Sequence, residues 1–115
     1  KREISDTRRA WDFVEAWIVS NWQHFSSDAE YGERAKLSPE YGFARDDCIN
    51  VYPMYLRAAL DDAGFASNKF LKEFAEMGLI RSSSEKNQRR FTKRVSYGGT
   101  KIHVIQIPQV MEGLL

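Results

Sequence analysis

The sequence has few of the residues that build metal sites, disulfides or membrane spans. Its 115 residues include one cysteine, Cys48, and two histidines, His24 and His103. A single cysteine cannot form an internal disulfide, and these three side chains are too few for a four-ligand zinc site of nitrogen and sulfur donors. The longest apolar runs are three or four residues, whereas a bilayer span needs about 20. We therefore expect no metal or other cofactor, no membrane partner, and a reducing, cytoplasmic environment.

Glycine and proline are also scarce, at seven and three residues, so the chain lacks the composition of a collagen-like or disordered protein. Hydrophobic residues make up 43% and charged residues 29%, which is typical of a globular domain. A chain of this length buries about two-thirds of its surface on folding. Residues 1–115 are expected to form a single domain. Because they open with Lys1-Arg2-Glu3 rather than with Met or a secretory signal, we expect a piece of a longer protein.

Positive charge is concentrated in one short stretch. Residues 1–80 contain ten basic and fourteen acidic residues, whereas residues 81–101 contain seven basic residues and one acidic residue, Glu85. A local basic patch on a nearly neutral domain favours a polyanionic partner such as DNA. The alternative is a solvated loop whose charges serve only solubility.

The N-terminal part predicts one long helix followed by a loop. Residues 5–25 place apolar side chains at intervals of three and four, which is typical of an amphipathic helix. Three tryptophans share its inner stripe, so we interpret them as core residues rather than as a ligand-stacking site. Residues 26–40 are polar and without periodicity, and are expected to be a surface loop.

Two shorter helices follow. Pro53 suits the first position of a helix that closes at Gly64, because a proline lacks the N–H that would be unpaired there. Ser67 is expected to be the N-cap of a third helix, which closes at Gly78. Two helices joined this closely make a helix-turn-helix over residues 53–78.

Gly98-Gly99 stands between two β-prone runs and predicts a tight hairpin, because such turns need positive φ. The turn sets the register, with Tyr97 opposite Thr100 and Lys93 opposite Val104. Alternation then gives the hairpin two faces. The core face is expected to carry Phe91, Val95, Tyr97, Ile102 and Val104, and the outer face Arg90, Thr92, Arg94, Ser96, Lys101 and His103, with Lys93 and Ile105 as exceptions.

The order of elements predicts an α+β fold, a winged helix-turn-helix. Residues 41–52 form short strands after the first helix, and in this fold the small strand pairs with the C-terminal hairpin. The hairpin, or wing, takes up residues 79–108, and residues 109–115 are a tail.

Much of the chain resembles a known module. The likeness is carried by Val51-Tyr52-Pro53, Phe70-Leu71, Glu76-Met77-Gly78-Leu79-Ile80, Arg90-Phe91-Thr92-Lys93-Arg94-Val95 and Ile105-Gln106-Ile107-Pro108, with support from the Trp11–Trp22 helix and Tyr41-Gly42-Phe43. These segments resemble the C-terminal winged-helix module of primase-helicase-associated ATPases carried by phages, plasmids and other mobile elements, a family largely of unknown function. The resemblance implies an accessory DNA-contacting domain of a larger ATPase. No GxxxxGK[ST] motif occurs in these residues, so no ATPase activity is assigned to them.

The expected DNA contacts lie on the wing and the third helix. Phosphate contacts position a protein without specifying sequence, and the candidates for them are Arg89, Arg90, Lys93, Arg94 and Lys101. The candidates on the recognition helix are Asn68, Lys69 and Lys72, with Glu73 and Glu76 beside them. We therefore expect DNA binding with weak sequence selectivity.

The sequence leaves two alternatives to DNA binding, a protein-docking module and an enzyme. The domain could dock a neighbouring protein or ATPase subunit through its third helix and the aromatic Tyr31, Tyr41 and Tyr52. An enzyme is poorly supported, because no candidate nucleophile has a general base near it in the sequence. Cys48 is interpreted as a small buried hydrophobic residue rather than as a reactive thiolate. The paired aspartates 46–47 and 61–62 are interpreted as turn and helix-end residues rather than as catalytic dyads. We expect no catalytic residue.

Overall fold

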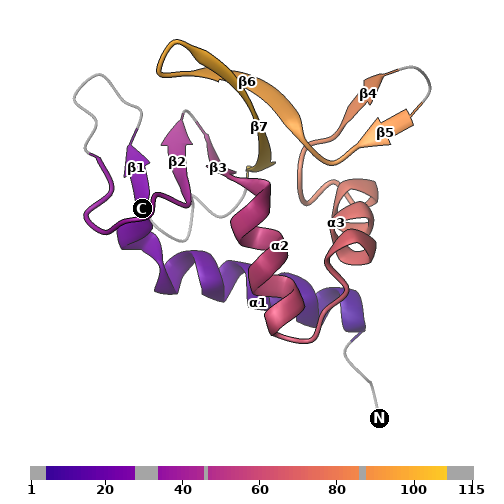
Figure 1. Cartoon of the computed structure of the whole chain (residues 1–115). Helices are drawn as coiled ribbons and strands as arrows, with labels where there is room; N and C mark the ends of the chain where they lie inside the picture. Colours follow the sequence, from indigo (N-terminus) through magenta and orange to yellow (C-terminus); the bar gives the residue numbers. More distant parts are fainter. Residues whose placement is uncertain (1–4, 28–33, 46, 86–87, 109–115) are drawn as a thin grey trace.

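The computed structural model describes residues 5–27, 34–45, 47–85 and 88–108, and it is an α+β winged helix-turn-helix, as the sequence predicted (Figure 1). The elements in chain order are α1 (Asp6–Ser20), the 3-10 turn η1 (Trp22–His24), β1 (Phe25–Ser27), β2 (Gly42–Arg45), β3 (Cys48–Val51), α2 (Pro53–Asp62), α3 (Ser67–Glu76), β4 (Ser83–Glu85), β5 (Gln88–Arg90), β6 (Lys93–Tyr97) and β7 (Thr100–Ile107).

One five-stranded sheet, in the order β1-β2-β3-β7-β6, joins the wing to the small strands after α1. Strand β3 runs antiparallel to β7, with Ile49 opposite Ile107, which is the pairing that a winged helix requires. The predicted wing register is confirmed, with Tyr97 opposite Thr100 and Lys93 opposite Val104. Gly98 and Gly99 have φ of 60° and 80°, the positive values that the turn needs.

Strand β7 separates two buried layers. Ile105 and Ile107 pack on the helices, in one core with Leu56 of α2 and Phe74 of α3. Val104 points to the opposite face of the sheet and is fully buried as well. The base of the wing is therefore covered on both sides, which fixes where the hairpin leaves the domain.

The first helix is shorter than predicted. Helix α1 ends at Ser20, and the Asn21 side-chain amide donates to the Trp17 carbonyl oxygen at 2.8 Å, which satisfies one of the last free acceptors of the helix. Residues 22–25 keep the helical spacing of apolar side chains but belong to η1 and β1. Periodicity misplaced the end because Phe25 is buried from a strand rather than from a helix face.

The expected loop over residues 26–40 begins as a strand. Strand β1 pairs in parallel with β2, placing Phe25 beside Gly42. A similar difference occurs after α3, where part of the polar stretch 82–90 forms the antiparallel hairpin β4–β5. Arg90 therefore pairs with Ser83 in that hairpin and does not lie on a wing strand, which corrects the expected alternation. Strands β4 and β5 are short and polar, so the sequence shows no apolar alternation that would predict them.

The cap of the third helix is also different. Helix α3 already begins at Ser67, its N-cap is Ala66, and no side chain of the cap residue bonds to the first turn. The Ser67 amide instead donates to the Asp61 carboxylate at 3.1 Å. Asp61, at the end of α2, thus fastens the two helices of the helix-turn-helix together.

Candidate nucleic-acid interface

The three candidate residues of α3 lie on its outer face. Asn68, Lys69 and Lys72 are all exposed. The Lys69 ammonium lies 5.0 Å from the centre of the Phe70 ring, a cation–π contact that keeps this charge near the start of the helix. Glu73 accepts a hydrogen bond of 2.6 Å from the Thr7 hydroxyl of α1. Glu73 therefore braces α3 against α1, and Glu76 is the exposed acid beside the two lysines.

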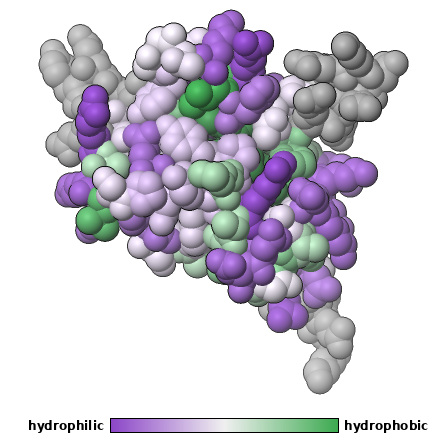
Figure 2. Space-filling model, viewed as in Figure 1, coloured by the Kyte–Doolittle hydropathy of each residue, from purple (hydrophilic) through white to green (hydrophobic). Residues whose placement is uncertain are grey.

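The wing presents its cations on one face. Arg94 lies opposite His103, Ser96 lies opposite Lys101, and all four side chains are exposed. Alternation puts Lys93 on the other face, where it is half-buried opposite Val104. Figure 2 shows hydrophilic side chains gathered over the wing at the top of the view and over α3 at the right.

Arg89 and Arg90 lie on β5, in the hairpin that rises beside the wing above α3 (Figure 1). Their side chains are outside the part of the chain that the structure describes. Of the five predicted phosphate contacts, the structure thus places Arg94 and Lys101 on the outer face of the wing and Lys93 on its inner face.

A cation of α2 that the charge pattern of the sequence did not single out also lies near the wing. The Arg57 guanidinium lies 5.1 Å from the centre of the Phe91 ring, and Arg57 is exposed. Phe91 also borders a hollow of about 40 Å³ together with Lys72 of α3. Phe91, half-buried before β6, thus brings a cation of α2 and a cation of α3 to the base of the wing. Nothing local in the sequence links Arg57 to Phe91, since they meet only in the tertiary fold.

The far end of the wing is fastened to the sheet. Tyr97 stacks on Phe43 of β2, with ring centres 3.9 Å apart and planes 1° from parallel. The Arg45 guanidinium lies 4.9 Å from the centre of the Phe43 ring. Glu40 accepts hydrogen bonds from the hydroxyls of Ser26, Tyr52 and Tyr97.

The environment of Glu40 perturbs one titratable group. Burial, and then the hydrogen bond to the Glu40 carboxylate and its charge, raise the pKa of the Tyr52 phenol well above its usual value. Tyr52 therefore stays protonated and remains a donor to Glu40 across the neutral and mildly alkaline range.

Comparison with known families classifies this arrangement. Residues 5–110 match the model of the Cch helix turn helix domain. The chain belongs to this family. The match spans every described helix and strand, and membership in a helix-turn-helix family suggests a DNA-binding role in general. No curated protein matches the chain.

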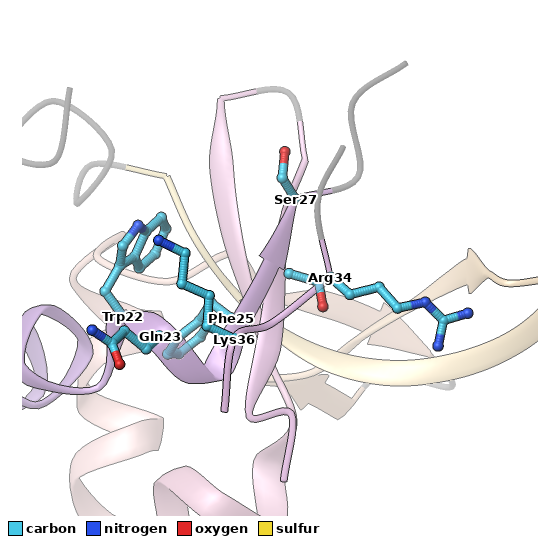
Figure 3. A pocket seen from close by; sticks show the side chains of 7 residues that line it. Trp22, Gln23, Phe25, Ser27, Arg34 and Lys36 are labelled. Atoms are coloured by element: carbon cyan, nitrogen blue, oxygen red, sulfur yellow. The ribbon is translucent and has the colours of Figure 1, made fainter. Parts of the chain in front are cut away.

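A larger hollow of this Cch helix turn helix domain lies at the other end of α1, away from the wing base. It measures about 200 Å³ and is bordered by Trp22, Phe25, Arg34 and Lys36, among others. Figure 3 shows Lys36 beside the Trp22 indole and Arg34 directed away from it. No carboxylate borders it among the described residues, so it offers no acid–base pair.

The aromatic residues of the domain are mainly packing residues. Trp11 meets Phe74 edge to face at 5.0 Å, and the half-buried Trp17 and Trp22 also pack against the core. Tyr41 stacks on Trp17 at 5.4 Å and on His24 at 4.3 Å. Tyr41 and Tyr52 are thus engaged within the domain, while Tyr31 lies outside the described residues.

The described part of the chain offers few groups for catalysis or for metal binding. Cys48 is buried in β3, as expected. No group of three or more described His, Cys, Asp or Glu side chains is arranged to hold a metal ion. No described helix has the length and apolar character needed to cross a membrane. Asp47 lies in the turn between β2 and β3, and Asp46 is outside the described residues.

Proposed function

We propose that this domain binds DNA mainly through the phosphate backbone, with the outer face of the wing and the cations of α3 as its contact surface. The observation that carries the proposal is the exposed row of Arg94, Lys101 and His103 on one face of the wing. Lysine and arginine donate to phosphate oxygens, and such contacts supply most of the affinity that does not depend on sequence.

The surface favours weak sequence selectivity. On α3 the exposed cations are Lys69 and Lys72, with Glu76 as an exposed acid beside them. Asn68, at the start of α3, is the one exposed amide there that could pair with an adenine edge. Because a single amide discriminates few sites, we propose that phosphate contacts dominate and that Arg89 and Arg90 of β5 add to them.

The wider context rests on the sequence resemblance. We propose that the domain is the accessory DNA-binding part of a larger replication or helicase-type ATPase of a mobile element. The residues that carry this resemblance include Val51-Tyr52-Pro53 at the start of α2 and Arg90-Phe91-Thr92-Lys93-Arg94-Val95 at the start of the wing. Other domains or subunits of that ATPase would then be its protein partners.

Fluorescence anisotropy tests the DNA proposal directly. A labelled duplex of two helical turns, about 20 base pairs, and its separate single strands would be titrated with the protein at several salt concentrations. We expect duplex binding that weakens steeply from about 50 to about 200 mM salt and varies little between unrelated sequences. Absence of affinity for either form at low salt would reject DNA binding and favour a protein-docking role.

A further inference from the structure

The wing of this domain does not stand free. Tyr97 is the last residue of β6, directly before the turn at Gly98-Gly99, so it lies at the far end of the hairpin. Its ring is parallel to that of Phe43, which is fully buried in β2. Figure 1 shows β6 and β7 curving back over β1, β2 and β3. The hairpin is therefore held at its base by β3 and at its far end by β2.

A carboxylate completes this attachment. Glu40, which lies just before β2, accepts from the Tyr97 hydroxyl at 3.2 Å. The same carboxylate accepts from Ser26 of β1 and from Tyr52 after β3, so hydroxyls from three parts of the sheet converge on it. Arg45 lies 5.8 Å from the centre of the Tyr97 ring and 4.9 Å from that of Phe43. We call Glu40, Phe43 and Tyr97 the wing anchor.

The anchor sets which way the cations face. Side chains alternate along a strand, so Tyr97 and Arg94 point to opposite faces of β6. Because the ring of Tyr97 is fixed against the sheet, Arg94 and its neighbour His103 are turned to the outside. Without the anchor, Arg94 and His103 would move with the hairpin. With it, their side chains have a defined direction relative to α3.

We propose that Glu40, Phe43 and Tyr97 are positioning residues that hold the cationic face of the wing ready for DNA, an inference that rests on the proposed function. They act through Arg94 and Lys101 and do not touch DNA themselves. A hairpin that is already in place loses less conformational freedom on binding. If release of the anchor leaves the wing in its binding orientation for about one-fifth to one-tenth of the time, the apparent affinity falls about five- to tenfold.

The salt dependence separates positioning from contact. Tyr97→Ala removes both the stack and the hydroxyl, and we expect about five- to tenfold weaker duplex binding with the log–log salt slope unchanged, because the number of phosphate contacts stays the same. Tyr97→Phe keeps the stack and should lose about twofold on the same reasoning. Val95→Ala, a truncation on the same face of the same strand, is the matched control and should change affinity little.

A distance measurement tests the anchor without DNA. Spin labels on Ser96→Cys of the wing and Ser27→Cys of β1, in a Cys48→Ala background, measure the distance between the wing and the first strand of the sheet. We expect one narrow distance distribution that Tyr97→Ala broadens while circular dichroism and the melting temperature confirm a folded domain. Tyr97→Phe supplies the comparison should the alanine variant fail to fold, and it should broaden the distribution less.

Two results would overturn the inference. One is a distance distribution that Tyr97→Ala and Tyr97→Phe leave narrow. The other is a loss of affinity in Tyr97→Ala accompanied by a lower salt slope, which would make Tyr97 part of the contact surface. A wild-type domain without DNA affinity would remove the proposed function instead, and the distance distributions would still decide whether these residues hold the wing.

Discussion

The ring of Tyr97 lies parallel to that of Phe43 with 3.9 Å between their centres, which joins the end of the wing to the second strand of the sheet. Aromatic pairs contribute about 0.5–1.5 kcal/mol beyond the area they bury. Arg94, one of the proposed DNA contacts, lies on the strand that ends at Tyr97. The strand that carries the exposed Arg94 is thus joined to the sheet by an aromatic contact.

Removing two wing cations should change the salt dependence of DNA binding. About four phosphate contacts give a log–log slope of about −3.6, and Arg94→Ala with Lys101→Ala should reduce its magnitude by about 1.8. Binding should weaken alike on unrelated duplexes, with the melting temperature nearly unchanged because both side chains are exposed. The matched control is Arg34→Ala with Lys36→Ala, which removes two exposed cations beside the hollow at Trp22. An equal effect of the control would mean that net charge alone matters.

Trp17 should be a packing residue. It is half-buried, stacks on Tyr41 and meets Phe25 edge to face at 6.2 Å. Trp17→Ala should lower the free energy of unfolding by about 3 kcal/mol, because it empties a packed site. Denaturant unfolding measures the change, and Val19→Ala, at a position 55% exposed on the same helix, should change it by less than about 0.5 kcal/mol. A stable Trp17→Ala domain would instead favour a ligand-stacking role for this residue.

Asp61 should stabilise the helix-turn-helix, whereas its neighbour should not. Its carboxylate accepts from the Ser67 amide in the first turn of α3. Asp61→Ala leaves this amide without that partner and should cost about 1 kcal/mol. Asp62→Ala removes the same charge from an exposed position and should fall within about 0.5 kcal/mol of wild type. Equal losses in the two variants would point to the negative charge rather than to the hydrogen bond between Asp61 and Ser67.

Alkaline pH should destabilise the domain through Tyr52. Burial and the Glu40 carboxylate raise the pKa of this phenol in the folded state, so the native state keeps a proton that the unfolded state releases near pH 10. The free energy of unfolding should therefore fall as the pH rises above about 10. Urea unfolding at about pH 9 and about pH 11 measures the fall, which should be smaller in Tyr52→Phe. An identical fall in both proteins would contradict the assignment to Tyr52.

The sequence alone determined the wing register and the approximate positions of the two helices of the helix-turn-helix. Both depend on short-range rules. A tight turn at Gly98-Gly99 pairs Tyr97 with Thr100 directly, and the apolar stripe of α3 ends beside Gly78, whose φ is 77°. These constraints act within a few residues, so they can be inferred from residues that are adjacent in the sequence.

Tertiary structure alone decided how these parts meet. Strand β1 pairs with β2, where Phe25 lies opposite Gly42. A Cβ added to Gly42 would lie 2.0 Å from the Asn50 carbonyl oxygen of β3 and 3.0 Å from the Phe25 ring, so only glycine fits between these two neighbours. The hydroxyl of Tyr97 reaches Glu40 across 57 positions of sequence, and no spacing rule connects them. Turn chemistry and periodicity are local, whereas parallel pairing and a shared carboxylate arise only when distant segments fold together. For that reason the sequence predicted which face of the wing carries Arg94 and Lys101, and the fold decided how that face is directed relative to the rest of the domain.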